Sequence, residues 1–202
     1  MYRRKDAFYH RAKDAGFRSR AAFKLIELAR SERLFKAGDR VLDLGAWPGG
    51  WSQVAAELVG PRGHVVAVDR RPIEALNPGN TEVIVGDLTD PAIEASVLAA
   101  CAGGVHVLLS DLAPSLTGIR ARDEAQGAQL VELVLHYAER LLRPGGSLLI
   151  KLFMSGEFTG SHGLLKRAFE QVRILRPEAT RKGSAELYAL ARRYRGAPPV
   201  ES

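Results

Sequence analysis

Short apolar runs alternate with amphipathic stretches along most of this chain. Runs rich in valine, isoleucine and leucine predict β-strands at residues 41–44, 64–69, 82–88, 105–110, 147–153, 171–176 and 186–192. Apolar residues at helical spacing predict helices at residues 51–59, 90–102, 123–142 and 162–170, and across 4–35 with an interruption near Gly16. Strands that alternate with helices are typical of α/β proteins. We therefore predict a doubly wound, mostly parallel seven-stranded sheet with helices on both faces.

The length and composition are those of one globular domain. A chain of 202 residues can bury a sizeable core, and neither repeats nor low-complexity segments interrupt it. We predict a single domain over residues 1–195 with a basic N-terminal helical segment at about 4–35, and a loose tail at 196–202. No apolar run approaches the roughly 18 residues of a membrane span, and no apolar segment of a secretory signal follows the basic N-terminus. The single cysteine, Cys101, excludes an internal disulfide and is typical of a reducing compartment. We therefore predict a cytoplasmic protein without membrane contact, and no metal site, because the five histidines lack ligand spacing.

The net charge of +6 is concentrated near the two ends of the chain. Residues 1–24 carry eight Lys and Arg against two Asp, and residues 171–195 carry seven against two Glu. A basic segment can be no more than a solvated face. Two such segments around a neutral to acidic centre favour a polyanion-binding surface, so we predict that both bind nucleic-acid phosphates.

The residues VLDLGAWPGGW at 41–51 form a strand, a glycine turn and the start of a helix. Glycines allow a ligand to approach the backbone closely, and the free N–H groups of a first helical turn face it. The spacing of Gly45, Gly49 and Gly50 differs from the dinucleotide fingerprint, and no G-K-[ST] follows as in a phosphate loop. The turn is therefore suited to a nucleoside with little or no phosphate, although a purely structural tight turn would also explain it.

Polar residues stand where several of the predicted strands end. Asp69 ends the second strand, 24 residues after Gly45, where α/β folds commonly bind ribose hydroxyls. Asp87 and Asp111 end the third and fourth strands. Lys151 interrupts the apolar fifth strand, and a charge inside a buried parallel strand is costly unless it is paired or functional. The alternative is a lysine at the strand end that reaches solvent.

Five motifs, taken together and in order, resemble the FtsJ/RrmJ family. They are GFRSRAAFKL at 16–25, DLGAWPGGWSQ at 43–53, SDLAP at 110–114, KLF at 151–153 and ELY at 186–188, and the similarity runs from about residue 5 to 193. That family comprises RNA ribose 2′-O-methyltransferases with the Rossmann-like fold of S-adenosylmethionine-dependent methyltransferases. Trp47 departs from the pattern, because the family often has a small residue there.

The resemblance implies a cofactor site and a catalytic group. The S-adenosylmethionine site would be lined by Gly45, Gly49, Trp51, Asp69, Asp87 and Asp111. Asp69 would bind the ribose hydroxyls and Asp87 the adenine edge. The catalytic group would be Lys24, Asp111, Lys151 and Glu186. Lys151 would act either as the base or as a charged group that orients the hydroxyl. Taken singly, Lys24, Asp111 and Glu186 could equally be a helix-surface lysine, a turn former and an exposed strand charge.

We therefore expect S-adenosylmethionine-dependent methylation of a ribose 2′-hydroxyl in RNA. By analogy with compact members of the family, the expected substrate is a uridine of large-subunit (23S) rRNA, within the large ribosomal subunit or its precursor, and the expected state is a monomer. One alternative is a tRNA ribose 2′-O-methyltransferase of the same family. Two others come from different classes: a methyltransferase for a small molecule or a protein, and a non-catalytic RNA-binding protein that retains the fold.

Overall fold

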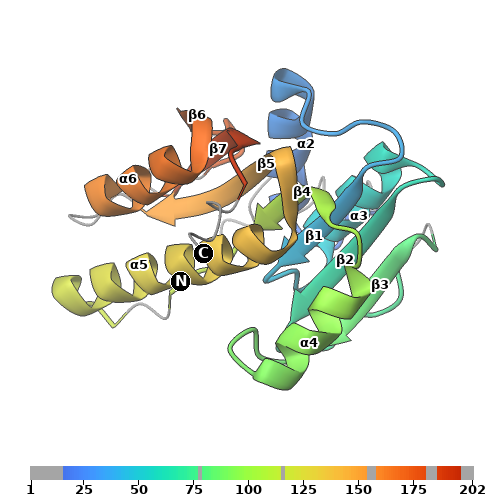
Figure 1. The fold of residues 1–202 in the computed structure, drawn as a ribbon, viewed down its shortest axis with the longest axis horizontal. Coiled ribbons are helices and arrows are strands. Elements are labelled where there is room, and N and C mark those ends of the chain that lie inside the picture. Colours follow the sequence, from blue (N-terminus) through green and yellow to red (C-terminus); the bar gives the residue numbers. More distant parts are fainter. Residues whose placement is uncertain (1–15, 77–78, 115–116, 154–157, 181–185, 197–202) are drawn as a thin grey trace, which may run out of the picture.

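Seven strands form one sheet in the order β3-β2-β1-β4-β5-β7-β6 (Figure 1). We analysed a computed structural model that describes residues 16–76, 79–114, 117–153, 158–180 and 186–196. All neighbouring strands are parallel except β7, which runs antiparallel to both β5 and β6. The predicted doubly wound, mostly parallel seven-stranded sheet is confirmed.

The strands are β1 Arg40–Leu44, β2 His64–Asp69, β3 Thr81–Val85, β4 Val105–Ser110, β5 Leu142–Phe153, β6 Phe169–Leu175 and β7 Glu186–Tyr194. The described helices are α2 Ala21–Glu32, α3 Gly50–Val59, α4 Pro91–Ala100, α5 Arg120–Leu141 and α6 Phe158–Ala168. Of the N-terminal segment predicted at about 4–35, positions 4–15 lie outside the described residues, as do most of the tail and part of the second basic segment, at 181–185. Among the described helices, none combines the length and apolar character needed to cross a bilayer.

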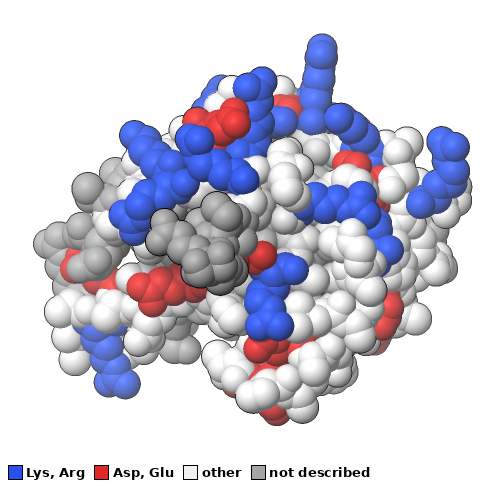
Figure 2. Space-filling view, viewed as in Figure 1, with Lys and Arg blue, Asp and Glu red and all other residues white. Residues whose placement is uncertain are grey.

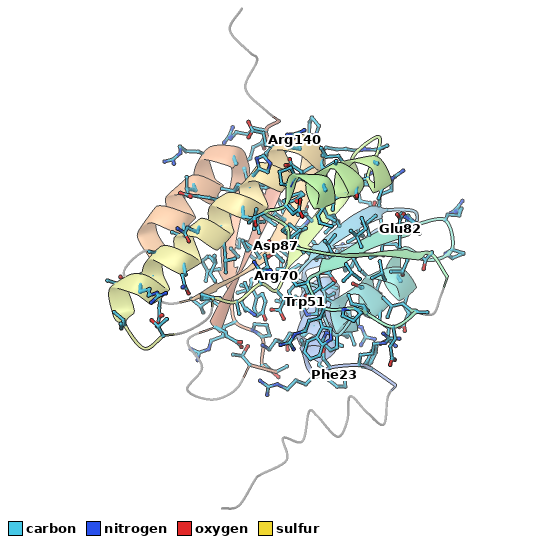
Figure 3. All side chains as sticks on the ribbon, turned by 90° about the horizontal axis from the view of Figure 1, so that it is seen from below. Phe23, Trp51, Arg70, Glu82, Asp87 and Arg140 are labelled. Carbon is cyan, nitrogen blue, oxygen red and sulfur yellow. The ribbon has the colours of Figure 1, made fainter. Side chains whose placement is uncertain are left out.

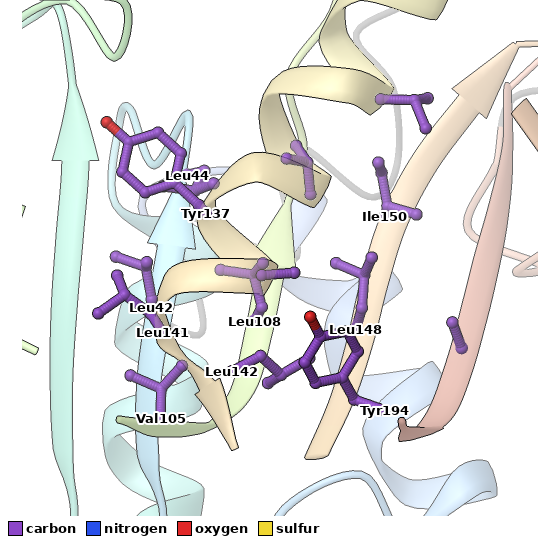
Figure 4. Packing of buried hydrophobic residues seen from close by; sticks show 14 of the residues in the cluster. Leu42, Leu44, Val105, Leu108, Tyr137, Leu141, Leu142, Leu148, Ile150 and Tyr194 are labelled. Atoms are coloured by element: carbon purple, nitrogen blue, oxygen red, sulfur yellow. The ribbon is translucent and has the colours of Figure 1, made fainter. Parts of the chain in front are cut away.

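The helices cover the two faces of the sheet with separate apolar cores. On one face, α4, α5 and α6 pack against side chains such as Leu42, Leu108 and Leu148 (Figure 4). Figure 1 shows α5 and α6 side by side over this face. On the other face, α2 and α3 pack against alternate residues of the same strands, among them Leu109 and Leu149. The central strands are buried on both faces, which explains their near-continuous apolar sequence.

The predicted elements differ from the structure mainly at the junction of α5 and β5. The helix begins at Arg120 rather than at residue 123, and β5 begins at Leu142, which pairs with Val105. The sequence RPGG at 143–146 predicts a turn that separates the two elements. In the structure it is absorbed into the strand as an irregularity, where Gly145 has a φ of +80° and the register with β4 shifts.

The reversed direction of β7 decides which residues meet at the functional edge. Parallel strands β1, β2, β3, β4 and β5 all end at one edge of the sheet, where ligands bind in open α/β folds. Because β7 is antiparallel, it begins at that edge, and its first residue, Glu186, pairs with Phe153 at the end of β5. The start of the last strand therefore joins the ends of the others.

Candidate functional site

The glycine turn after β1 brings the backbone close to its neighbours. The Gly45 N–H donates to the Val68 carbonyl at 2.9 Å, and Gly45 has a φ of +79°. A Cβ at this position would lie 2.5 Å from Cδ2 of Leu112. Both the positive φ and the close approach require glycine here. The turn thus packs directly against Leu112, with no room for a side chain at Gly45.

A cavity of about 420 Å³, which we call the large cavity, opens beside this turn. Its size is within the range of small-molecule sites. One part of its wall is apolar, with Leu88, Leu112, Pro114, Leu130 and Leu133, and another is polar, with Asp69, Arg70, Asp87, Thr89, Gln126 and Gln129. Figure 3, seen from below, shows Asp87, Arg70 and Trp51 following one another toward Phe23 of α2. The cavity combines an apolar slot with carboxylates, as a nucleoside requires.

Asp69 and Asp87 both line the large cavity, as predicted for a cofactor site. The Asp69 carboxylate accepts hydrogen bonds from the backbone N–H groups of Trp47 and Arg71, each at 2.9 Å. Hydrogen bonds from the backbone and hydroxyl of Thr89, together with the Arg70 guanidinium 2.7 Å away, hold the pKa of Asp87 below its usual range. Both carboxylates therefore face the cavity from backbone-anchored positions.

A second cavity of about 280 Å³, the small cavity, lies on the other side of the turn. It is lined by Ser19, Arg20, Ala21, Lys24, Gly45, Ala46, Trp47, Pro48, Gly50, Trp51, Asp111 and Glu186. Gly45 lines both cavities, so the two spaces lie on either side of the glycine turn.

The four predicted catalytic residues come together although they belong to distant segments: Lys24, Asp111 and Glu186 line the small cavity, and Lys151 lies behind them against Asp111. Lys24 Nζ of α2 lies 2.7 Å from Glu186 Oε2. Lys151 Nζ of β5 lies 3.1 Å from Asp111 Oδ1 and also donates to the Asp111 carbonyl at 2.7 Å. The lysine side chains are only 5% and 7% exposed, so both ion pairs lie in a medium that screens charge weakly.

Tyr188 joins the two ion pairs, and the sequence analysis did not predict this role. Lys24 donates to the Tyr188 hydroxyl at 3.3 Å, and this hydroxyl donates to Asp111 Oδ1 at 3.0 Å. Burial, followed by the nearby Asp111 and Glu186 charges, raises the pKa of Tyr188, so the hydroxyl stays protonated. Alternation along β7 places Tyr188 on the same face as Glu186, but only the strand pairing sets it opposite Lys151.

The resulting chain of polar contacts runs Glu186–Lys24–Tyr188–Asp111–Lys151. Burial alone would raise the pKa of Glu186, but the hydrogen bond and charge of Lys24 outweigh it and lower that pKa. In this series of contacts each buried ammonium lies beside a carboxylate, and their attraction offsets the cost of burying the charges. Such a group can hold a hydroxyl and accept its proton beside the large cavity.

Asp43, on β1 below the turn, adds a further buried carboxyl. Its Oδ2 accepts the Ser52 hydroxyl at 2.6 Å, while Oδ1 has no protein hydrogen-bond partner within the described residues. Burial raises the pKa of Asp43 to about 7, and the charges of Asp111 and Asp69 add to this effect. The turn between the two cavities therefore rests on a carboxyl group that titrates near neutral pH.

Three of the predicted cofactor residues, Gly49, Trp51 and Asp111, do not line the large cavity, and Asp111 and Trp51 line the small one instead. Gly49 precedes α3 with a φ of +103°, and a Cβ there would lie 3.0 Å from Ile73. Trp51 is 3% exposed, and its indole N–H donates to the Ala21 carbonyl at 2.8 Å. Its ring also packs on Tyr188, with centroids 5.6 Å apart. Trp51 therefore links α3, α2 and β7 around the small cavity.

Basic side chains gather over β6, β7 and α2 (Figure 2). The predicted basic face over residues 171–195 is nevertheless divided. Arg176 follows Leu175, which pairs with Tyr188 in line with Lys151, so Arg176 belongs to the functional edge. Arg192 pairs with Ser147 far from that edge. Because β7 runs antiparallel to β6, arginines at its end lie at the opposite edge from Arg176.

These cavities fit an S-adenosylmethionine-like ligand and a separate acceptor. The carboxylates of Asp69 and Asp87 can accept hydrogen bonds from ribose hydroxyls and an exocyclic amine, and the leucine-lined wall can pack on an aromatic base. Negative groups near the turn, including Asp111, suit a cationic ligand. The acceptor would reach the alternating lysines and carboxylates from the small cavity.

Comparisons with known proteins agree with this arrangement. A family model described as FtsJ-like methyltransferase matches residues 17–194. The sequence is 44% identical to the ribosomal RNA large subunit methyltransferase E of Acidithiobacillus ferrooxidans, over 95% of this chain and 87% of that relative. A crystal structure described as a ribosomal RNA methyltransferase of Plasmodium falciparum matches with a TM-score of 0.79 at 23% identity, over 90% of this chain and all (100%) of that one. The fibrillarin of Aeropyrum pernix, solved with natively bound S-adenosyl-L-methionine, matches with a TM-score of 0.59 at 21% identity, over 86% of this chain and 74% of that one. The two solved structures share the fold.

Proposed function

The chain belongs to the FtsJ-like methyltransferase family, and we propose that it transfers a methyl group from S-adenosylmethionine to a ribose 2′-hydroxyl of large-subunit ribosomal RNA. The observation that carries this proposal is the series of contacts from Glu186 to Lys151, three members of which line the small cavity on the other side of the glycine turn from the large one. The RNA class follows the relatives that carry the name ribosomal RNA large subunit methyltransferase E.

The large cavity would hold the methyl donor. Asp69 would accept the ribose hydroxyls and Asp87 the adenine amine, while Leu112 and its apolar neighbours would pack on the base. When bound, S-adenosylmethionine supplies an activated methyl group on a sulfonium. The chain's own task is then to orient the acceptor and to manage one proton.

The small cavity would hold the acceptor ribose. Lys151 would orient the 2′-hydroxyl. The hydroxyl proton would pass to the Lys151–Asp111 pair, in which Lys151 Nζ and Asp111 Oδ1 lie 3.1 Å apart. Lys24 and Glu186 would keep that pair in place through Tyr188. In this arrangement the protein lowers the barrier mainly by alignment, which is effective only when the reacting groups are held close to the productive geometry.

Basic residues around the small cavity would bind the RNA backbone. Arg20 lines the cavity, and Arg18 is fixed beside it by hydrogen bonds to the carbonyls of Glu74 and Ala75 at 2.8 and 2.6 Å. Phosphate contacts position RNA without reading its sequence. We further propose that the target is a uridine in the large subunit or its precursor, and that the protein acts as a monomer in the cytoplasm, where such subunits are assembled in prokaryotes.

Two other functions receive less support. The names of the relatives do not favour a tRNA substrate. A non-catalytic RNA-binding protein would have no use for two lysines that are almost fully buried against carboxylates, since burying such pairs is costly unless they act or specify structure.

The proposal is tested by transfer of labelled methyl from S-adenosylmethionine. The acceptors are large ribosomal subunits, free rRNA and tRNA from a strain that lacks this protein, and the product nucleoside is identified by mass. We expect 2′-O-methyluridine in the subunits or rRNA. Lys151→Ala should reduce transfer at least 100-fold with an unchanged dissociation constant for S-adenosylmethionine. Lys166→Ala, which removes an exposed lysine of α6, is the matched control and should leave transfer unchanged. Label in tRNA alone, or full turnover by Lys151→Ala, would contradict the substrate or the catalytic assignment respectively.

A further inference from the structure

Trp47 is an aromatic side chain that the fold leaves exposed at the small cavity. It is 48% exposed, and the other large apolar residues exposed to this degree among those described, Leu58, Val85 and Ile119, are aliphatic. It lines the cavity together with Lys24, Asp111 and Glu186. Trp51, four residues later, is 3% exposed and packed in the core. Exposing an indole beside a catalytic group forgoes a large gain from burial, so a ligand is the natural partner.

Trp47 is held at its backbone and by a contact over its ring. Its backbone N–H donates to Asp69 Oδ2 at 2.9 Å, and the Arg71 N–H donates to Asp69 Oδ1 at the same distance. The Arg71 guanidinium lies over the Trp47 ring, 4.6 Å from the ring centroid. One carboxylate thus fixes the backbones of both members of a cation–π pair, and the guanidinium contact favours one orientation of the ring.

We propose that Trp47, backed by Arg71, is a stacking platform for an RNA base carried by the nucleotide whose ribose enters the small cavity or by its immediate neighbour. This inference rests on the proposed function and adds a residue that positions the substrate. Aromatic side chains flanked by cationic groups are how proteins bind unpaired bases, and an RNA site must present its target ribose from an unpaired or splayed nucleotide. Trp47 lines the small cavity and not the large one, which places its ring on the side of the acceptor rather than of the methyl donor.

The charges around Trp47 also favour RNA over an apolar partner. Arg20 lines the same cavity, Arg71 covers the indole, and Arg18 is fixed beside the turn. These guanidinium groups make the surroundings of Trp47 cationic, and a nucleotide offers both a π-face to the ring and a phosphate to the positive charges.

The first experiment measures steady-state methylation of large subunits from a strain that lacks this protein, together with S-adenosylmethionine affinity by calorimetry. Trp47→Ala should lower kcat/KM for subunits about 5- to 150-fold, the range for loss of one stacked base, and leave the cofactor dissociation constant within about twofold. Trp47→Phe should restore most of kcat/KM. Leu58→Ala, which truncates an exposed side chain on α3, is the matched control and should match the wild type.

The second experiment uses tryptophan fluorescence and stays informative if Trp47→Ala folds poorly. Hexauridylate should quench the wild-type emission, and a six-residue abasic RNA with the same phosphates should not. In Trp47→Phe, the emission of buried Trp51 should be insensitive to both probes.

The outcomes separate this inference from the proposed function. A wild type that labels no RNA overturns the proposed function. A wild type that methylates subunits while Trp47→Ala keeps full kcat/KM, or loses cofactor affinity instead, overturns the platform alone. Equal quenching by the hexauridylate and abasic probes also overturns it.

Discussion

Asp43→Asn should abolish a pH dependence of stability that the buried Asp43 carboxyl imposes. The pKa of Asp43 is raised from 3.8 to about 7 in the folded protein, mainly by burial. A group whose folded pKa is raised stabilises the protein below its unfolded pKa, and this stability is lost as the pH rises through the folded pKa. The wild type should therefore lose stability, relative to the variant, between about pH 4 and pH 7, and no further above that.

The size of this effect follows from the two pKa values. A difference of about 3 in pKa corresponds to ~4 kcal/mol in the free energy of unfolding, at 1.36 kcal/mol for each pKa unit. Asparagine preserves the acceptor for the Ser52 hydroxyl but adds an amide that needs partners of its own, which costs about 1–3 kcal/mol. That cost does not depend on pH. The change with pH, rather than the difference at one pH, therefore measures the carboxyl.

The assay is urea unfolding of both proteins, without cofactor, at several values from about pH 4 to pH 8. The difference between their unfolding free energies should change by ~4 kcal/mol across this range, in favour of the variant at high pH. Asp123→Asn is the control of opposite sign. Hydrogen bonds from Thr117 lower the pKa of Asp123. In that pair the unfolding free energy of the wild type should therefore increase, relative to the variant, as the pH rises from about 4. Parallel curves for wild type and Asp43→Asn would refute the argument that burial keeps this carboxyl neutral.

Two further substitutions test the geometry of the site. Tyr188→Phe removes the hydroxyl that joins Lys24 to Asp111 but keeps the buried ring. We expect the free energy of unfolding, measured by heat or urea, to fall by ~1–3 kcal/mol and methyl transfer to fall at least tenfold. Unchanged turnover would mean that the two ion pairs act separately. Gly45→Ala places a Cβ 2.5 Å from Leu112 at a φ of +79°. The substitution should lower the free energy of unfolding by ~1–2 kcal/mol and weaken S-adenosylmethionine binding, measured by calorimetry. Normal cofactor affinity would show that the turn does not shape the large cavity.

The fold could be predicted from the sequence because its central strands are buried on both faces. Such strands are continuous apolar runs, and their alternation with helices specifies a parallel sheet. The junction of α5 and β5 could not be predicted, because the glycine and proline that normally end an element are accommodated there by an irregular strand pairing. Turn residues indicate a local bend but not whether a neighbouring strand still pairs with it.

The candidate site could be predicted residue by residue more easily than it could be assembled. Lys151 was identifiable from its position inside an apolar strand, and Glu186 from its motif. Tyr188 could not be distinguished from an ordinary aromatic core residue without the strand pairing that sets it opposite Lys151. For the same reason the sequence predicts one basic surface over residues 171–195. In the structure β7 runs antiparallel to β6, so Arg192 lies away from the functional edge.

The place of β7 in the sheet bears on how the protein comes into being during translation. β7 follows the other described strands in the sequence, yet it inserts between β5 and β6, and β6 pairs with no other described strand. The carboxylate that pairs with the buried Lys24 ammonium belongs to Glu186, which is synthesised 162 residues later. Long-range pairings of this kind form late in folding. A chain that lacks β7 therefore has neither the complete sheet nor the contacts from Glu186 to Lys151, and the proposed methyl transfer requires this strand to be in place.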